Sequence, residues 1–98
     1  MIILAGTVRI QPGMRDKAIP HIQTMVAASR AEAGCTAFDF SIDIFDDHLV
    51  RVFEIYESQA ALDAHRDTPH FAAWRAGWAE CGIGDRAISE YDATARKK

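Results

Sequence analysis

Residues 54–74 read EIYESQAALDAHRDTPHFAAW, and this stretch decides the fold because it starts as a strand and ends as a helix. Ser58 stands where a helix N-cap belongs, since its hydroxyl can accept a hydrogen bond from a free N–H of the first turn. Leu62 and His65 are three residues apart and therefore share one face of the helix that follows. Pro69 ends that helix, because it lacks an N–H and restricts the residue before it, and it can open the next helix.

Four strands and two long helices are expected in the chain. The strands follow from alternating apolar and polar residues, and the helices from apolar residues that recur every three or four positions. The expected strands are residues 2–11, 35–44, 49–57 and 87–93, and the expected long helices are residues 14–33 and 71–81. This β-α-β-β-α-β order predicts an α+β, ferredoxin-like protomer, in which helices cover one face of an antiparallel four-stranded sheet.

Several glycines and one proline predict local features of the helices and the first strand. Pro20 lies inside the first expected helix and predicts a kink or a late start there. Gly34 is placed to cap the C-terminus of the same helix, and Gly82 and Gly84 are expected to end the second. Gly6 leaves room for a close approach to the first strand, although a simple packing accommodation explains it equally well.

The third expected strand is apolar on both faces, because Val50, Val52 and Tyr56 alternate with Leu49, Phe53 and Ile55. A strand of this kind is covered on both sides. The helices supply one cover, and a chain this short has little left to supply the other. We therefore expect a homodimer in which a second protomer covers the open face of the sheet.

Size and composition set further bounds. The 98 residues predict a single domain, residues 1–98. A formal net charge of −3 gives no electrostatic reason to expect nucleic acid or an anionic membrane as a partner. No apolar run reaches the roughly 20 residues of a transmembrane helix. Cys35 and Cys81 lie far apart without a CxxC spacing, which predicts inert, reduced thiols and a cytoplasmic protein.

The polar side chains of residues 54–74 are the candidate catalytic groups. Glu54 sits in the apolar row of the third strand, where an unpaired carboxylate costs several kcal/mol. It must pair with a cation, such as Arg75 or an arginine of a partner chain, become protonated, or serve a function. His65 and His70 are five residues apart with Pro69 between them, which is not the spacing of a helical metal pair, so we expect no metal. Together with Glu54 and Tyr56 they are candidate acid–base and orienting groups.

Four segments of the chain resemble the antibiotic biosynthesis monooxygenase family, which includes quinol monooxygenases. They are Ala33-Gly34-Cys35-Thr36-Ala37-Phe38, Phe53-Glu54-Ile55-Tyr56, Ala61-Leu62-Asp63-Ala64-His65 and Thr68-Pro69-His70-Phe71. The resemblance covers essentially the whole chain and is most specific between Glu54 and Phe71.

The resemblance implies a dimeric α+β barrel with a pocket for a flat aromatic substrate between the sheet and its helices. It implies a monooxygenase that oxidises a quinol or a polycyclic, polyketide-like aromatic with molecular oxygen and without metal, flavin or haem. That chemistry needs a base that forms an electron-rich phenolate or carbanion. The expected catalytic residues are Glu54, His65 and His70, and the expected substrate-binding residues are Tyr56, Phe38, Phe71 and Trp74.

The chain departs from the family pattern at two positions, and a third position bears on haem chemistry. Tyr56 stands where many members carry a tryptophan, and Phe38 where a tyrosine is usual, so one hydroxyl is lost. Arg75 lies at about the position of the axial histidine of the haem-degrading branch, which disfavours haem breakdown. Two other functions stay open: a non-catalytic dimer that binds a small aromatic ligand, and isomerase or decarboxylase chemistry on the same fold.

Overall fold

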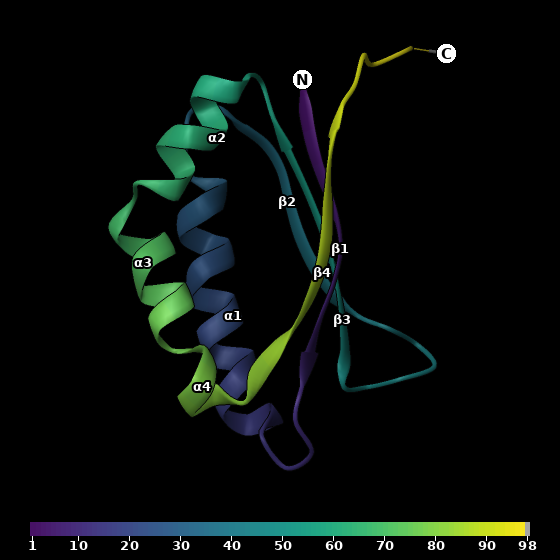
Figure 1. Cartoon of the computed structure of the whole chain (residues 1–98), viewed down its shortest axis with the longest axis vertical. Coiled ribbons are helices and arrows are strands. Elements are labelled where there is room, and N and C mark those ends of the chain that lie inside the picture. Colours follow the sequence, from purple (N-terminus) through teal and green to yellow (C-terminus); the bar gives the residue numbers. More distant parts are fainter. Residues whose placement is uncertain (98) are drawn as a thin grey trace.

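The computed structural model describes residues 1–97 and has two layers, a sheet and a layer of helices on one of its faces (Figure 1). In chain order the elements are β1 (Ile2–Ile10), α1 (Arg15–Arg30), β2 (Cys35–Ile42), β3 (Leu49–Tyr56), α2 (Gln59–Arg66), α3 (Pro69–Ala76), α4 (Trp78–Cys81) and β4 (Ile83–Asp92). This arrangement confirms the α+β, ferredoxin-like fold. None of the helices within residues 1–97 has the length and apolarity needed to cross a membrane.

The four strands form one antiparallel sheet in the order β2-β3-β1-β4. The central strand β3 therefore has a neighbour on each side. Its Glu54 lies opposite Leu4 of β1 and opposite Phe38 of β2. A polar side chain at this position is surrounded by apolar neighbours within the sheet itself.

The core lies between the sheet and the helices. Alternate residues of β1 and β3 point toward the helices and are buried, as the period of two predicted. From the helix layer, Met25 and Leu62 are among the buried residues of the same core. The opposite face of the sheet, which includes Phe53 and Tyr91, is partly exposed.

Two side-chain caps position the helices that follow β3. The Ser58 hydroxyl accepts a hydrogen bond from the Ala61 N–H and begins α2, as predicted. The Thr68 hydroxyl does the same for Phe71 N–H, and Pro69 occupies the first position of α3. These caps fix the points where the chain leaves the sheet and where it turns between α2 and α3.

Several local predictions need correction. The expected helix 71–81 is divided at Gly77 into α3 and α4, where the backbone has φ −85° and ψ −6°. The His21 ring lies where a side chain at this position would extend, so only glycine fits there. β4 begins at Ile83, so Gly82, in the left-handed region with φ 68°, ends the helix, whereas Gly84 belongs to the strand. Of the two effects predicted for Pro20, a kink or a late start, the late start is wrong, because α1 begins at Arg15 and contains Pro20.

Two glycines permit close contacts between elements. A Cβ on Gly6 would collide with the backbone of Ala87 and Ile88 in β4, so the expected close approach to β1 is present. Gly34 is not a helix cap, because α1 ends at Arg30 with Ala31 as its C-cap. It lies instead against Ala61 of α2. These contacts bring β4 and α2 close to the rest of the core.

Candidate active site

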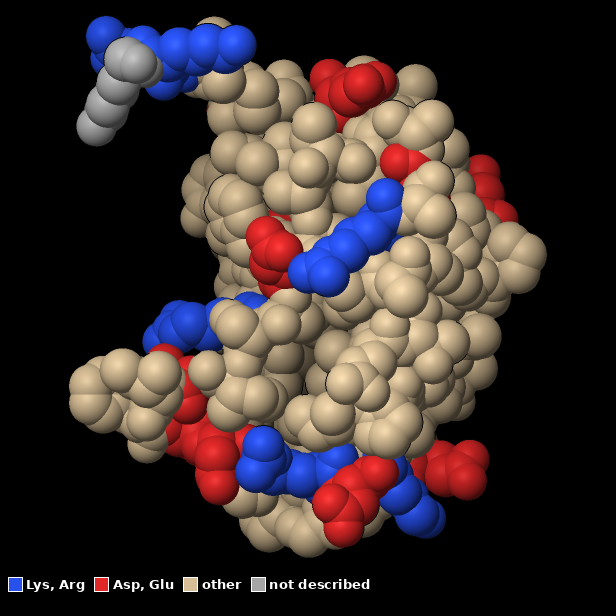
Figure 2. Space-filling view, turned by 180° about the vertical axis from the view of Figure 1, so that it is seen from behind, with Lys and Arg blue, Asp and Glu red and all other residues tan. Residues whose placement is uncertain are grey.

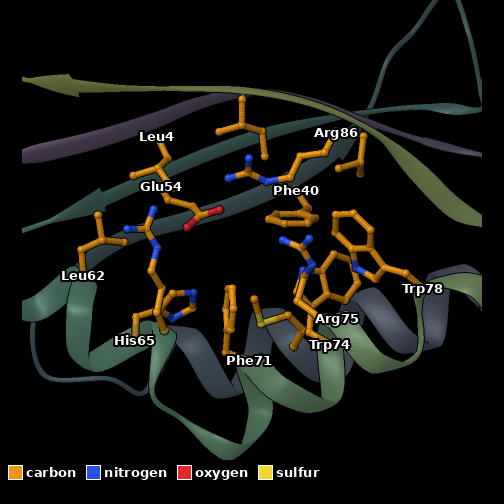
Figure 3. A pocket seen from close by; sticks show the side chains of 14 residues that line it. Leu4, Phe40, Glu54, Leu62, His65, Phe71, Trp74, Arg75, Trp78 and Arg86 are labelled. Atoms are coloured by element: carbon orange, nitrogen blue, oxygen red, sulfur yellow. The ribbon is translucent and has the colours of Figure 1, made fainter.

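A pocket lies between the sheet and the helices, and side chains from both layers enter it (Figure 3). Its solvent-accessible space is about 40 Å³, which is room for a water molecule or two but not for an aromatic ring. A larger ligand can enter only if side chains at the mouth move. The lining residues are Leu4, Val8, Met25, Phe40, Glu54, Leu62, His65, Arg66, Phe71, Trp74, Arg75, Trp78, Arg86 and Ile88.

Glu54 is the carboxylate of this pocket. Its side chain projects from β3 toward the helix layer and is only 6% exposed. The Tyr56 hydroxyl donates a hydrogen bond of 2.6 Å to Glu54 Oε1. Burial disfavours the charged form and raises the pKa of Glu54, although this hydrogen bond and the nearby Arg86 and Arg66 oppose the change. No arginine forms an ion pair with Glu54 among the side chains of residues 1–97.

His65 lies near the C-terminal end of α2 and is 2% exposed. Its imidazole packs against the rings of Tyr56 and Phe71, with 5.2 Å between ring centroids in each case. Its Nδ1 lies 2.8 Å from Glu32 Oε2. Burial lowers the pKa of His65, which the hydrogen bond to Glu32 partly offsets, so the imidazole is neutral near pH 7.

Glu32 holds both histidines. It lies in the turn between α1 and β2, and its Oε2 is also 2.6 Å from His70 Nε2. A carboxylate only accepts hydrogen bonds, so each imidazole donates through the nitrogen that faces it. For neutral His65 the proton is then on Nδ1, and Nε2 is the unprotonated nitrogen available to a molecule in the pocket.

Within residues 1–97, no hydrogen bond joins either histidine of the candidate acid–base group to Glu54: both histidines bind Glu32, and Glu54 binds Tyr56. The sequence reasoning missed Glu32, which no local motif distinguishes. The pairing of β2 with β3 does indicate where Glu32 lies. The β2–β3 hairpin places Cys35 opposite Tyr56, so the turn before β2 lies beside the start of α2. A carboxylate in that turn can therefore reach side chains of α2 and α3.

The four expected substrate-binding residues do not all line the pocket. Phe71 and Trp74 line the pocket. Tyr56 and Phe38 do not: they are 0% and 1% exposed and belong to the core around it. Tyr56 nevertheless reaches the site through its hydrogen bond to Glu54. His70 does not line the pocket either, and is linked to it by its hydrogen bond to Glu32 and its contact with the His65 ring.

Glu32, His65 and His70 are also the residues best placed to hold a metal ion near the pocket. Their potential ligand atoms lie within 4.8 Å of one another. Two imidazoles and a carboxylate suit several first-row transition metals. In the arrangement observed, the same three atoms satisfy one another, because both imidazole N–H groups donate to one carboxylate oxygen.

Comparisons with known proteins agree with the fold. The family model described as "Antibiotic biosynthesis monooxygenase" matches residues 1–77. A Mycobacterium tuberculosis protein named "Putative monooxygenase Rv0793" is 36% identical over 66 residues, which are 67% of this chain and 64% of that protein. Its structure has a TM-score of 0.85 at 25% identity and covers 99% of this chain and 98% of that chain.

Two further relatives show the same similarity. "Uncharacterized protein sll1783" of Synechocystis is 36% identical over 70 residues, which are 71% of this chain, so the chain matches only 48% of that protein's length. A Pseudomonas aeruginosa structure has a TM-score of 0.84 at 30% identity and covers 96% of this chain and 94% of that one. With the match of the family model over most of its length, this chain belongs to the antibiotic biosynthesis monooxygenase family.

Proposed function

We propose that the protein is a cofactor-independent monooxygenase that oxidises a quinol or a polycyclic aromatic with molecular oxygen. Family membership and the name of the M. tuberculosis relative support a monooxygenase-type function. One observation carries the finer proposal: an imidazole, held by a carboxylate at Nδ1, lines a pocket between the sheet and the helices. This is the arrangement of an oriented general base.

In the proposed reaction His65 Nε2 takes a phenolic proton from the substrate. The resulting phenolate is rich in electrons and is oxidised directly by molecular oxygen. For a simple hydroquinone the balance is one quinol and one O₂ giving one hydroxyquinone and one water. One oxygen atom enters the ring, and the other leaves as water with two hydrogens from the quinol.

The residues around His65 have distinct parts in this proposal. Glu32 sets the tautomer and stabilises the imidazolium that forms when His65 accepts the proton. His70 is more exposed than His65, with 23% against 2% of the side chain accessible, so it offers Glu32 a path for the proton toward solvent. Glu54 retains a proton to higher pH than an ordinary carboxyl and can supply it to the reduced oxygen.

The experiment is oxygen consumption by the purified protein with a panel of hydroquinones, with no added cofactor and after dialysis against a chelator. We expect uptake that falls by about 100-fold or more in His65→Ala, since general base catalysis contributes roughly 10² to 10⁴. Uptake that requires an added metal would contradict the cofactor-free mechanism. Tight binding of hydroquinones without uptake would favour a binding protein instead.

A further inference from the structure

We infer that the pocket selects an aromatic substrate that carries a carboxylate, or an equivalent anionic group, and that Arg86 and Arg75 recognise it. Three arginines line the pocket against a single carboxylate, that of Glu54. Arg66 is already committed, because its guanidinium forms an ion pair with Glu90. Within residues 1–97, Arg75 and Arg86 have no acidic partner of this kind.

The two remaining arginines enter the pocket from opposite layers (Figure 3). Arg86 extends from β4 toward Glu54, and Arg75 extends from α3 toward the sheet. The Arg75 guanidinium lies over the Trp78 ring at 4.3 Å from its centroid. Stacking of this kind occupies the face of the guanidinium and leaves its N–H edge free to bind an anion.

The charges in the pocket favour an anion. Arg75 and Arg86 bring two positive charges, whereas His65 is neutral and the buried Glu54 is the only opposing carboxylate among the lining residues. A planar guanidinium matches a carboxylate with two parallel hydrogen bonds. A ligand with a carboxylate beside its ring would place this group on the arginines and its phenol near His65.

A second observation points to an acceptor atom on the ligand. Trp78 Nε1 is buried and has no hydrogen-bond partner among the described residues. An unpaired buried donor is costly, and Trp78 lines the pocket. A carboxylate or phenolate oxygen could accept from it. The small free volume is that of a closed pocket. Arg75 and Arg86 are exposed and have long side chains, so they can move when a ligand enters.

The inference rests on the proposed function for the aromatic nature of the ligand, but binding tests it without turnover. The probes are salicylate and salicylamide, which have nearly the same shape and differ in charge. Calorimetry should show that salicylate binds about 10- to 100-fold more tightly, the range expected for hydrogen bonds to charged groups. Arg86→Gln and Arg75→Gln should each reduce this preference, and the double variant should abolish it.

Arg96→Gln is the matched control, because it makes the same charge change in the C-terminal segment, away from the pocket. It should keep the preference. Arg86→Lys keeps the charge but loses the planar guanidinium that can donate two parallel hydrogen bonds, so it should retain part of the preference for salicylate. Equal affinity for the two probes, no binding of either, or a preference that survives in the double variant would overturn the inference.

Turnover separates this inference from the proposed function. Gentisate is hydroquinone with a carboxylate, so its kcat/KM for oxygen uptake should exceed that of hydroquinone. This advantage should shrink in Arg86→Gln and disappear in the double variant. A salicylate preference without oxygen uptake on any hydroquinone would contradict the proposed function and leave the anion site standing. Equal oxygen uptake with gentisate and hydroquinone, without a binding preference for salicylate, would contradict the anion site and leave the proposed function standing.

Discussion

At the scale of single residues, one oxygen of Glu32 accepts hydrogen bonds from both His65 and His70. This carboxylate is a positioning group: it does not line the pocket, but it determines which nitrogen of His65 can act there. Its hydrogen bond and its charge also raise the pKa of His65 against the larger lowering effect of burial. Changes at Glu32 should therefore appear in the pH dependence of activity.

Glu32→Gln should lower kcat by tenfold or more, because an amide can donate to Nδ1 and stabilise the wrong tautomer. In the wild type the acid limb of kcat/KM should lie below the ordinary histidine pKa of 6.5, since burial lowers the pKa of His65. In Glu32→Gln this limb should move to still lower pH. Glu80→Gln, an exposed change on α4, should leave the profile unmoved. A profile unchanged by Glu32→Gln would contradict the role given to Glu32.

Glu54→Gln should unfold at the same or a higher temperature than wild type near pH 7. Glu54 titrates near 4.5 in the unfolded chain and at higher pH when folded. The folded protein therefore binds the extra proton between these values, and this contribution to stability is complete below pH 4.5 and lost as pH rises through the folded pKa. The variant avoids that loss, and its amide oxygen still accepts from Tyr56.

Thermal melts of the two proteins across pH 4 to 8 test this expectation, and the advantage of Glu54→Gln should shrink toward acid pH. If Glu54 were instead the partner of a buried arginine, the same change would cost ~3–5 kcal/mol. A clear loss of stability at pH 7 would therefore contradict the environment described for Glu54. Loss of oxygen uptake in the stable variant would support a catalytic role.

Much of the site could be predicted from residues close in sequence, but its central hydrogen bonds could not. The alternation along 49–57 indicated a buried Glu54, and the Ser58 cap and Pro69 indicated where His65 and His70 would lie. The bonds from Glu32 to these histidines span 33 and 38 positions. They depend on how α1, α2 and α3 pack on the sheet, which no local pattern records.

At the scale of the elements, the packing of β4 against β1 depends on Gly6. A Cβ at this position would overlap the backbone of Ala87 and Ile88, near the irregular register between Thr7 and Arg9. β4 carries Arg86 and Ile88, both of which line the pocket. The pairing of these two strands therefore also determines the shape of the candidate site.

Gly6→Ala should destabilise the protein by about 1–3 kcal/mol, the usual cost of inserting a group into a filled space. Chemical denaturation of the variant and the wild type measures the difference. Gly84→Ala is the matched control on β4, because no atom lies within 4 Å of the position of its Cβ. Equal losses in both variants would show that the close contact at Gly6 does not matter.

The boundaries of the elements show why local signals gave only part of the fold. Ser58 and Pro69 act through neighbouring atoms, so the start of α2 and the boundary between α2 and α3 were predictable. At the break at Gly77 the contact is distant in sequence: His21 Nε2 lies 2.9 Å from the Trp74 carbonyl oxygen, and the His21 ring leaves no room for a side chain on Gly77. The early start of β4 depends on pairing with β1, in which Gly84 lies opposite Arg9.

At the scale of the whole molecule, one face of the sheet has no helices (Figure 1). On this face Ile3, Phe53 and Tyr91 come from neighbouring strands, and Phe53 and Tyr91 are 41% and 54% exposed. The hairpin between β2 and β3 projects from the sheet on the side away from the helices, with Phe45 91% exposed. Figure 2 shows basic and acidic side chains intermixed over one side of the molecule, without a continuous basic surface.

We propose that a second copy of the chain covers this face. The expected interface is an obligate one, and such interfaces often bury on the order of 2,000 Å² or more. Light scattering at micromolar concentration should therefore give the mass of a dimer. Phe53→Glu should shift the protein toward monomer, because it places a charge in the apolar face. Ala72→Glu, an exposed change on α3, should leave the dimer intact. A monomeric wild type would contradict the proposal.

Chemical rescue of His65→Gly tests the central claim most directly, because it asks whether the imidazole itself is the base. The measurement is oxygen uptake with a hydroquinone substrate of the wild type, with and without added imidazole. If His65 takes the substrate proton, the variant should lose about 100-fold or more of the rate, and imidazole should restore part of it in a saturable manner. A His65→Gly protein that consumes oxygen at the wild-type rate without imidazole would contradict the account.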